Sequence, residues 1–104
     1  MLKQFKETEP RLRLEIPCTL NFSREEHPAK IVNISYSGLG IELLVEGPVL
    51  DSRDVQSVTV EGIGTLHARV LWKRGAKLGL KFASKRNARP ALDAFFKKIG
   101  DYPF

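Results

Sequence analysis

The sequence is poor in the residues that form disulfides, metal sites and membrane spans. Its one cysteine, Cys18, excludes an internal disulfide and is expected to be a small buried side chain. The two histidines, His27 and His67, lack further ligands at metal-binding spacing. No apolar run approaches the roughly 20 residues that cross a bilayer, and the charged start is unlike a secretory signal. We therefore expect a cytoplasmic protein without cofactor, metal or membrane insertion.

Arrangements typical of catalysis are also missing. Ser35 is not surrounded by the Gly-x-Ser-x-Gly pattern of an activated nucleophile. The neighbouring carboxylates Glu25 and Glu26 fall in a polar stretch, where solvated charge is expected in place of acid–base chemistry. The sequence therefore predicts a protein that binds a ligand or a partner and is not an enzyme.

Neither sign of charge dominates, but basic residues are in excess. There are 17 Lys plus Arg against 12 Asp plus Glu in 104 residues, which gives a net charge of +5 with neutral histidines. This excess favours anionic partners through long-range attraction. Aromatic residues make up only 9% of the chain, and most fall on expected core faces. A barrel that stacks single-stranded nucleic acid on exposed aromatics is therefore disfavoured.

Apolar residues alternate with polar ones along most of the chain, which indicates strands with one buried face. The clearest case is Arg11 to Phe22, where Pro17 lies on the outward set and predicts an edge or a bend. A hairpin loop is expected at 23–28. In the strand expected at 65–73, Trp72 belongs to the buried set, so we expect it to pack in the core and not to stack on a base. The remaining strands are expected at 29–34, 39–43, 55–61, 65–73 and 77–82.

The apolar period changes near the end of the chain. Leu92, Phe95, Phe96 and Ile99 recur at the spacing of one amphipathic helix, about 87–99. Asn87 is the expected N-cap, Pro90 is expected in the first turn, and Gly100 suits the position after the last residue.

Together these patterns predict an all-β fold: a six-stranded antiparallel β-barrel with one C-terminal amphipathic helix that closes one opening. The length suits one domain. We expect a flexible N-terminal segment at 1–10 and a single, self-contained barrel domain at 11–104.

The segment from Asn33 to Gly38 is the strongest candidate for function. It contains Asn33, Ser35 and Gly38 at the spacing Asn-x-Ser-x-x-Gly, followed by an alternating strand. Short polar side chains and a glycine suit any tight turn, and they also leave backbone N–H groups accessible to a flat or anionic ligand. Tyr36, within this turn, is expected to be exposed.

With these residues, the chain from about 7 to 99 resembles the PilZ family, whose members are small barrels that recognise the bacterial second messenger cyclic di-GMP. Asn33, Ser35 and Gly38 match the family's (Asp/Asn)-x-Ser-x-x-Gly motif. The segments 68–72 and 77–82 resemble its last two strands, and the Phe95-Phe96 helix resembles its closing helix.

The family's second motif, Arg-x-x-x-Arg, precedes the first strand. The resemblance places its second arginine at Arg11, but Glu7 occupies the place of the first. Arginine suits this position because its planar fork offers several donors to phosphate and guanine. Arg13 on the first strand and Lys6 in the N-terminal segment are further candidate cations.

The resemblance implies a cyclic di-GMP receptor whose N-terminal segment rearranges on binding and which signals to a protein effector of motility, pilus or exopolysaccharide machinery. Its ligand-binding residues would be Arg11, Asn33, Ser35, Gly38, Arg13 and Lys6. Glu7 favours the alternative, a degenerate PilZ domain that acts as a protein-protein adaptor without nucleotide binding.

Overall fold

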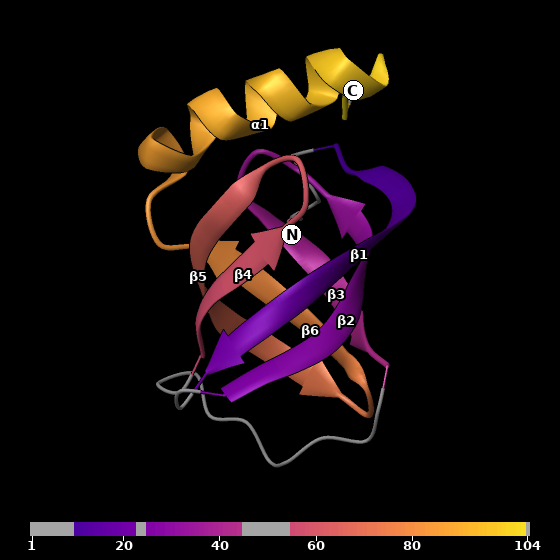
Figure 1. The fold of residues 1–104 in the computed structure, drawn as a ribbon, viewed down its shortest axis with the longest axis vertical. Coiled ribbons are helices and arrows are strands. Elements are labelled where there is room, and N and C mark those ends of the chain that lie inside the picture. Colours follow the sequence, from indigo (N-terminus) through magenta and orange to yellow (C-terminus); the bar gives the residue numbers. More distant parts are fainter. Residues whose placement is uncertain (1–9, 23–24, 45–54, 104) are drawn as a thin grey trace, which may run out of the picture.

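The computed structural model describes residues 10–22, 25–44 and 55–103, and within them six antiparallel strands form a closed barrel in the order β1-β2-β3-β6-β5-β4 (Figure 1). One helix, α1, follows the last strand. The predicted all-β class and the helix are therefore confirmed. The elements are β1 (Leu12–Phe22), β2 (Glu25–Ile34), β3 (Gly38–Leu43), β4 (Val55–Val60), β5 (Gly64–Arg74), β6 (Lys77–Phe82) and α1 (Lys85–Ile99).

The barrel interior is filled by the inward side of the alternating strands. Leu20, Ile31, Ile41, Val58 and Leu78 come from five different strands and are fully buried. Cys18 is 8% exposed, and burial raises the pKa of its thiol to about 12. It is the small buried side chain that the sequence predicts.

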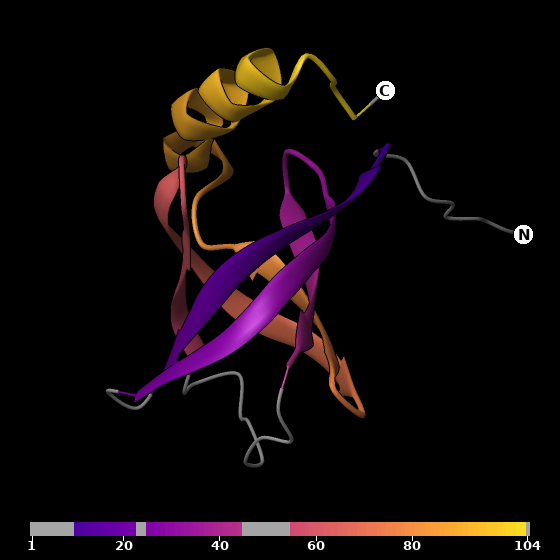
Figure 2. The ribbon, with the colours of Figure 1, turned by 45° about the vertical axis from the view of Figure 1, so that its right-hand side comes forward.

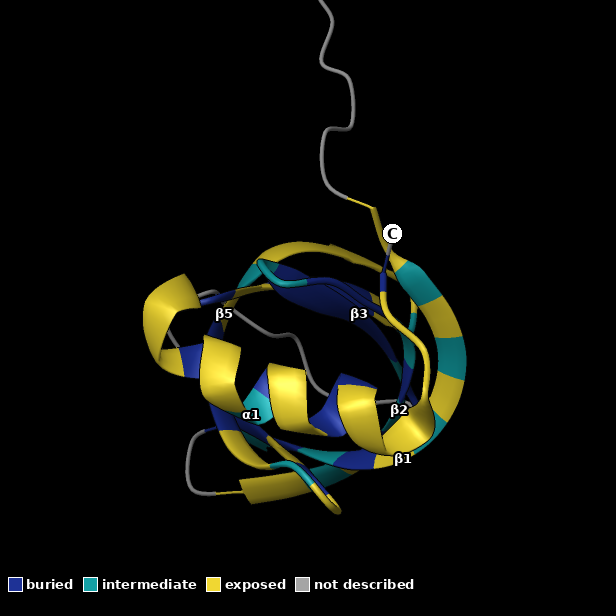
Figure 3. Ribbon diagram, turned by 90° about the horizontal axis from the view of Figure 1, so that it is seen from above, coloured by how far each residue is buried: buried dark blue, intermediate teal, exposed yellow. Residues whose placement is uncertain are grey.

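Helix α1 lies across one mouth of the barrel, with its buried residues toward the strands and its exposed residues outward (Figure 3). Its buried residues are Ala88, Leu92, Phe95 and Phe96. No described helix is long and apolar enough to cross a membrane.

The start of α1 differs from the prediction. Ser84, not Asn87, is the N-cap, because the Ser84 side chain accepts a hydrogen bond from the Asn87 backbone N–H at 3.1 Å. Pro90 therefore lies in the second turn, where it removes a backbone donor. The end of α1 agrees with the prediction. Gly100 follows the last helical residue in a left-handed backbone conformation, with φ 74°, and its N–H donates to the carbonyls of Phe96 and Lys97.

The second strand starts earlier than the pattern predicted, whereas β1 agrees with the predicted span. β2 begins at Glu25, so most of the predicted loop is strand, and His27 stacks on Phe22 at a centroid distance of 4.3 Å. Pro17 pairs with Lys30 of β2, while the ladder with β4 covers only Cys18 to Phe22. The proline thus stands where one side of β1 is an edge, as predicted. Lys6, Glu7 and the rest of the N-terminal segment 1–9 lie outside the described residues.

Candidate functional site

The turn between β2 and β3 lies at the mouth of the barrel that α1 covers (Figures 1 and 2). Ser35 organises it and is fully buried. Its N–H donates to the Gly38 carbonyl at 2.8 Å, and its Oγ accepts the N–H groups of Ser37 and Gly38 at 3.2 and 3.3 Å. The Ser35 side chain therefore stabilises the turn from within.

Arg11 reaches this turn from the start of β1. Its Nε donates to Asn33 Oδ1 at 2.7 Å, and its Nη1 lies 3.5 Å from Ser35 Oγ. The chain entering the barrel and the Asn33–Gly38 turn are therefore side by side. A guanidinium held by two side chains loses little further freedom when it binds an anion.

Gly38 begins β3 where the backbone of β6 passes closely. A Cβ at this position would collide with the carbonyl oxygen of Leu80. Gly38 is buried, and it allows the close approach of the two strands.

One row of residues runs across five strands on the outer surface of the barrel. Arg13 of β1 pairs with Asn33 of β2, Asn33 with Gly40 of β3, Gly40 with Gly79 of β6, and Gly79 with Trp72 of β5. Register shifts occur beside this row in three of the ladders. Bulges of this kind redirect side chains and are common at functional sites.

Trp72 is not in the core, so that prediction was wrong. The shift between Val70 and Trp72 inserts Leu71 as an extra residue, and it turns Trp72 outward with 50% of its surface exposed. The indole lies over Gly79, where a Cβ would collide with its Nε1. The Asn33 amide lies over Gly40 in the same way, 2.6 Å from where a Cβ would stand. The two glycines thus form a floor under Asn33 and Trp72.

Two adjoining hollows of about 340 and 330 Å³ lie over this row and share Arg11, Asn33, Gly40 and Trp72. We call them together the glycine-floor groove. Arg13, Glu42 and Lys77 line its first part, and Leu71 lines its second. Of the predicted site residues, Arg11, Arg13 and Asn33 line the groove, Ser35 and Gly38 support it, and Lys6 lies outside the described residues. Trp72 and Glu42 are lining residues that the sequence did not assign.

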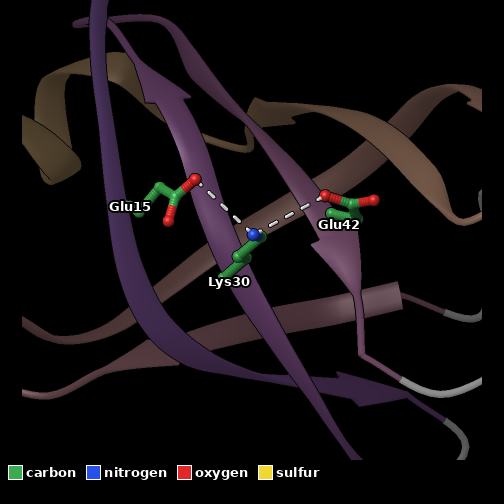
Figure 4. A network of polar contacts seen from close by, with 3 residues as sticks. All are labelled: Glu15, Lys30 and Glu42. Atoms are coloured by element: carbon green, nitrogen blue, oxygen red, sulfur yellow. Dashed lines mark ion pairs between the residues drawn. The ribbon is translucent and has the colours of Figure 1, made fainter.

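Beside the groove, three charged side chains form a chain of ion pairs across β1, β2 and β3 (Figure 4). Lys30 Nζ lies 3.6 Å from Glu15 Oε2 and 4.0 Å from Glu42 Oε1. Glu15 is outside the groove, whereas Glu42 lines it.

Tyr36 joins the turn to α1, although the sequence suggested an exposed side chain. Its hydroxyl donates to Asp93 Oδ1 at 2.8 Å, and its ring meets Phe96 edge-on at 5.2 Å. Arg89, which pairs with Asp93 at 3.4 Å, lies over the same ring at 4.0 Å. Desolvation, followed by the hydrogen bond to Asp93, raises the pKa of Tyr36.

We expect Tyr36→Phe to lower the free energy of unfolding by about 0.5–1.5 kcal/mol, because one hydrogen bond between the turn and α1 is lost. Thermal unfolding at pH 7 measures this. Asp93→Asn is the comparison, since its amide oxygen still accepts from Tyr36, and it should cost less. Because folding raises the pKa of Tyr36, the stabilisation by this hydrogen bond is complete below pH 10.0, the ordinary pKa of tyrosine. It is lost as the pH rises through the pKa of Tyr36 in the folded state. Equal stability of Tyr36→Phe and wild type at pH 7 would contradict this role.

The described residues contain no group of three or more His, Cys, Asp or Glu side chains that could hold a metal ion. No curated protein matches the chain significantly. The family model of the PilZ domain matches residues 6–96, which is most of the 104 residues. This span includes every strand and the glycine-floor groove, and it ends at Phe96 within α1. With the closed barrel and the Asn33–Gly38 turn beside Arg11, the match shows that the chain belongs to the PilZ domain family.

Proposed function

We propose that this domain binds cyclic di-GMP in the glycine-floor groove and acts as a receptor for that nucleotide. The observation that carries the proposal is the position of Arg11, which Asn33 and Ser35 hold at one side of a glycine floor while Trp72 lies at the other. The ligand combines anionic phosphates with flat guanine bases. A charged fork and an exposed aromatic face across a small-residue floor suit those two parts.

Each lining residue has a distinct role in this proposal. Arg11 and Arg13 hold phosphate oxygens, with Lys6 as a further cation from the N-terminal segment. A base stacks on the Trp72 indole, which is half exposed. Asn33 supplies polar contacts through its amide while it keeps Arg11 in position. Gly40 and Gly79 leave room for the Asn33 amide and the Trp72 indole to lie close against β3 and β6.

The domain would be a cytoplasmic receptor or adaptor without catalytic activity. In support, Ser35 Oγ is buried and used by its own turn, and burial raises the pKa of the Cys18 thiol to about 12, so neither is an available nucleophile. Binding would rearrange the N-terminal segment and signal to a protein effector of motility, pilus or exopolysaccharide machinery.

A second candidate function is a protein-protein adaptor that does not bind nucleotide. Glu7 favours it, because a carboxylate stands four residues before Arg11 where the family's motif has an arginine. A negative charge there would repel phosphate. An adaptor of this kind would capture the same partners from cells with and without cyclic di-GMP.

Trp72 provides a direct test, since it is the only tryptophan in the sequence. We expect cyclic di-GMP to quench its fluorescence in a saturable titration and to give binding heat by calorimetry. Trp72→Ala should still give heat, but with an affinity reduced about five- to a hundredfold, as expected when stacking is lost. The absence of both heat and quenching in the wild-type protein would end the receptor proposal.

A further inference from the structure

Glu42 is an unexpected residue in a groove that otherwise suits an anion. It lies on β3 two residues after Gly40, so it faces the same side of the sheet about 7 Å from the glycine floor. Its neighbours on the adjacent strands are both basic: Lys30 on β2 and Lys77 on β6. A carboxylate at this position reduces the attraction of the groove for phosphate.

The ion pair with Lys30 is too weak to explain why a carboxylate lies in this groove. The distance between Lys30 Nζ and Glu42 Oε1 is 4.0 Å, at the limit of an ion pair, and Glu15 competes for the same ammonium group at 3.6 Å. The Glu42 side chain is 36% exposed, and ion pairs at such exposure contribute little to stability. Its carboxylate therefore remains available to a ligand in the groove.

We propose that Glu42 selects guanine over adenine, an inference that rests on the proposed function. A carboxylate accepts hydrogen bonds at both oxygens and donates none. The Watson–Crick edge of guanine carries two adjacent donors, the N1–H and the 2-amino group, which match those oxygens. Adenine presents an unprotonated N1 in the same place, so its lone pair would face the carboxylate. Trp72 and Glu42 line the same hollow, so a base stacked on the indole would turn its edge toward β3 at Glu42.

This role and a merely electrostatic one predict opposite results. If Glu42 only adds negative charge to the groove, its removal should strengthen the binding of any cyclic dinucleotide. If Glu42 accepts the guanine edge, its removal should weaken cyclic di-GMP and leave cyclic di-AMP unchanged or tighter.

The experiment is calorimetry of the full chain with cyclic di-GMP and with cyclic di-AMP, for wild type, Glu42→Gln and Glu15→Gln. We expect the wild-type protein to prefer cyclic di-GMP by about tenfold or more, the discrimination that a bidentate contact to a base provides. Glu42→Gln should lose most of that preference, mainly through weaker cyclic di-GMP binding.

Glu15→Gln is the matched control, because it removes the same charge from the same lysine outside the groove. It should keep the wild-type preference, and thermal unfolding should show both variants folded. Wild-type discrimination in Glu42→Gln, or tighter binding of both nucleotides, would overturn the inference while leaving the receptor proposal intact. A wild-type protein that binds neither nucleotide would overturn both.

Discussion

We expect Gly38→Ala to destabilise the barrel by about 1–3 kcal/mol or more, because the added methyl group has no space. Its Cβ would collide with the Leu80 carbonyl oxygen, which is part of the backbone of β6 and cannot rotate away. The strands β3 and β6 would have to separate at the point where Gly38 pairs with Lys81. In a domain of this size the midpoint of thermal unfolding should fall by at least about 4 °C.

Gly79→Ala is the comparison for this prediction. Its Cβ would meet the Trp72 indole, a side chain that can move, and not the backbone. We therefore expect a smaller loss of stability together with a changed Trp72 fluorescence spectrum. Equal stability losses in the two variants would show that the close approach of β3 and β6 is not what requires glycine at Gly38.

Arg11→Ala should weaken cyclic di-GMP binding by about ten- to a hundredfold or more, the effect of losing a charge-assisted hydrogen bond. The substitution also leaves Asn33 Oδ1 without its 2.7 Å donor, so the amide loses its fixed orientation in the groove. Arg11→Lys should recover only part of the affinity, because an ammonium group cannot bond two acceptors in the fixed geometry of the guanidinium fork. Calorimetry measures both variants.

Arg86→Ala is the control for charge, since Arg86 is exposed on α1 away from the groove. It should bind as wild type does. Glu7→Arg, which restores the second arginine of the motif, should tighten binding. If Arg11→Ala binds as tightly as Arg86→Ala, the assignment of Arg11 to the ligand is wrong. If neither wild type nor Glu7→Arg binds, the adaptor function is favoured.

Much of the fold follows from the apolar periods of the sequence. The alternation in β1 and β6 and the helical spacing from Leu92 to Ile99 are direct signals of which face is buried. The N-cap was misplaced because Ser84 and Asn87 are both good capping residues. Only the backbone geometry shows that Ser84 is extended, with φ −140° and ψ 107°, while Asn87 already lies in the helix.

The site was predictable in part. The motif spacing correctly brought Arg11 beside Asn33 and Ser35, but it could not show that Ser35 is enclosed by its turn. Trp72 and Glu42 were missed for a common reason: membership of the groove depends on register between strands. The bulge at Leu71 turns the Trp72 side chain from the inner to the outer face of the barrel. The alternation of apolar and polar residues along one strand does not reveal such an inserted residue. The sequence did contain one signal of the groove: Gly79 lies inside a predicted strand, and a glycine in that position often indicates that another group packs closely against the backbone.

The glycine pair at the centre of the groove has a consequence for how this domain can diverge. Side chains at Gly40 or Gly79 would displace Asn33 or Trp72 on the outer surface, while the main-chain ladder between β3 and β6 needs neither position to be glycine. A single small substitution at either glycine would therefore disturb the proposed nucleotide site and keep the barrel intact for another use.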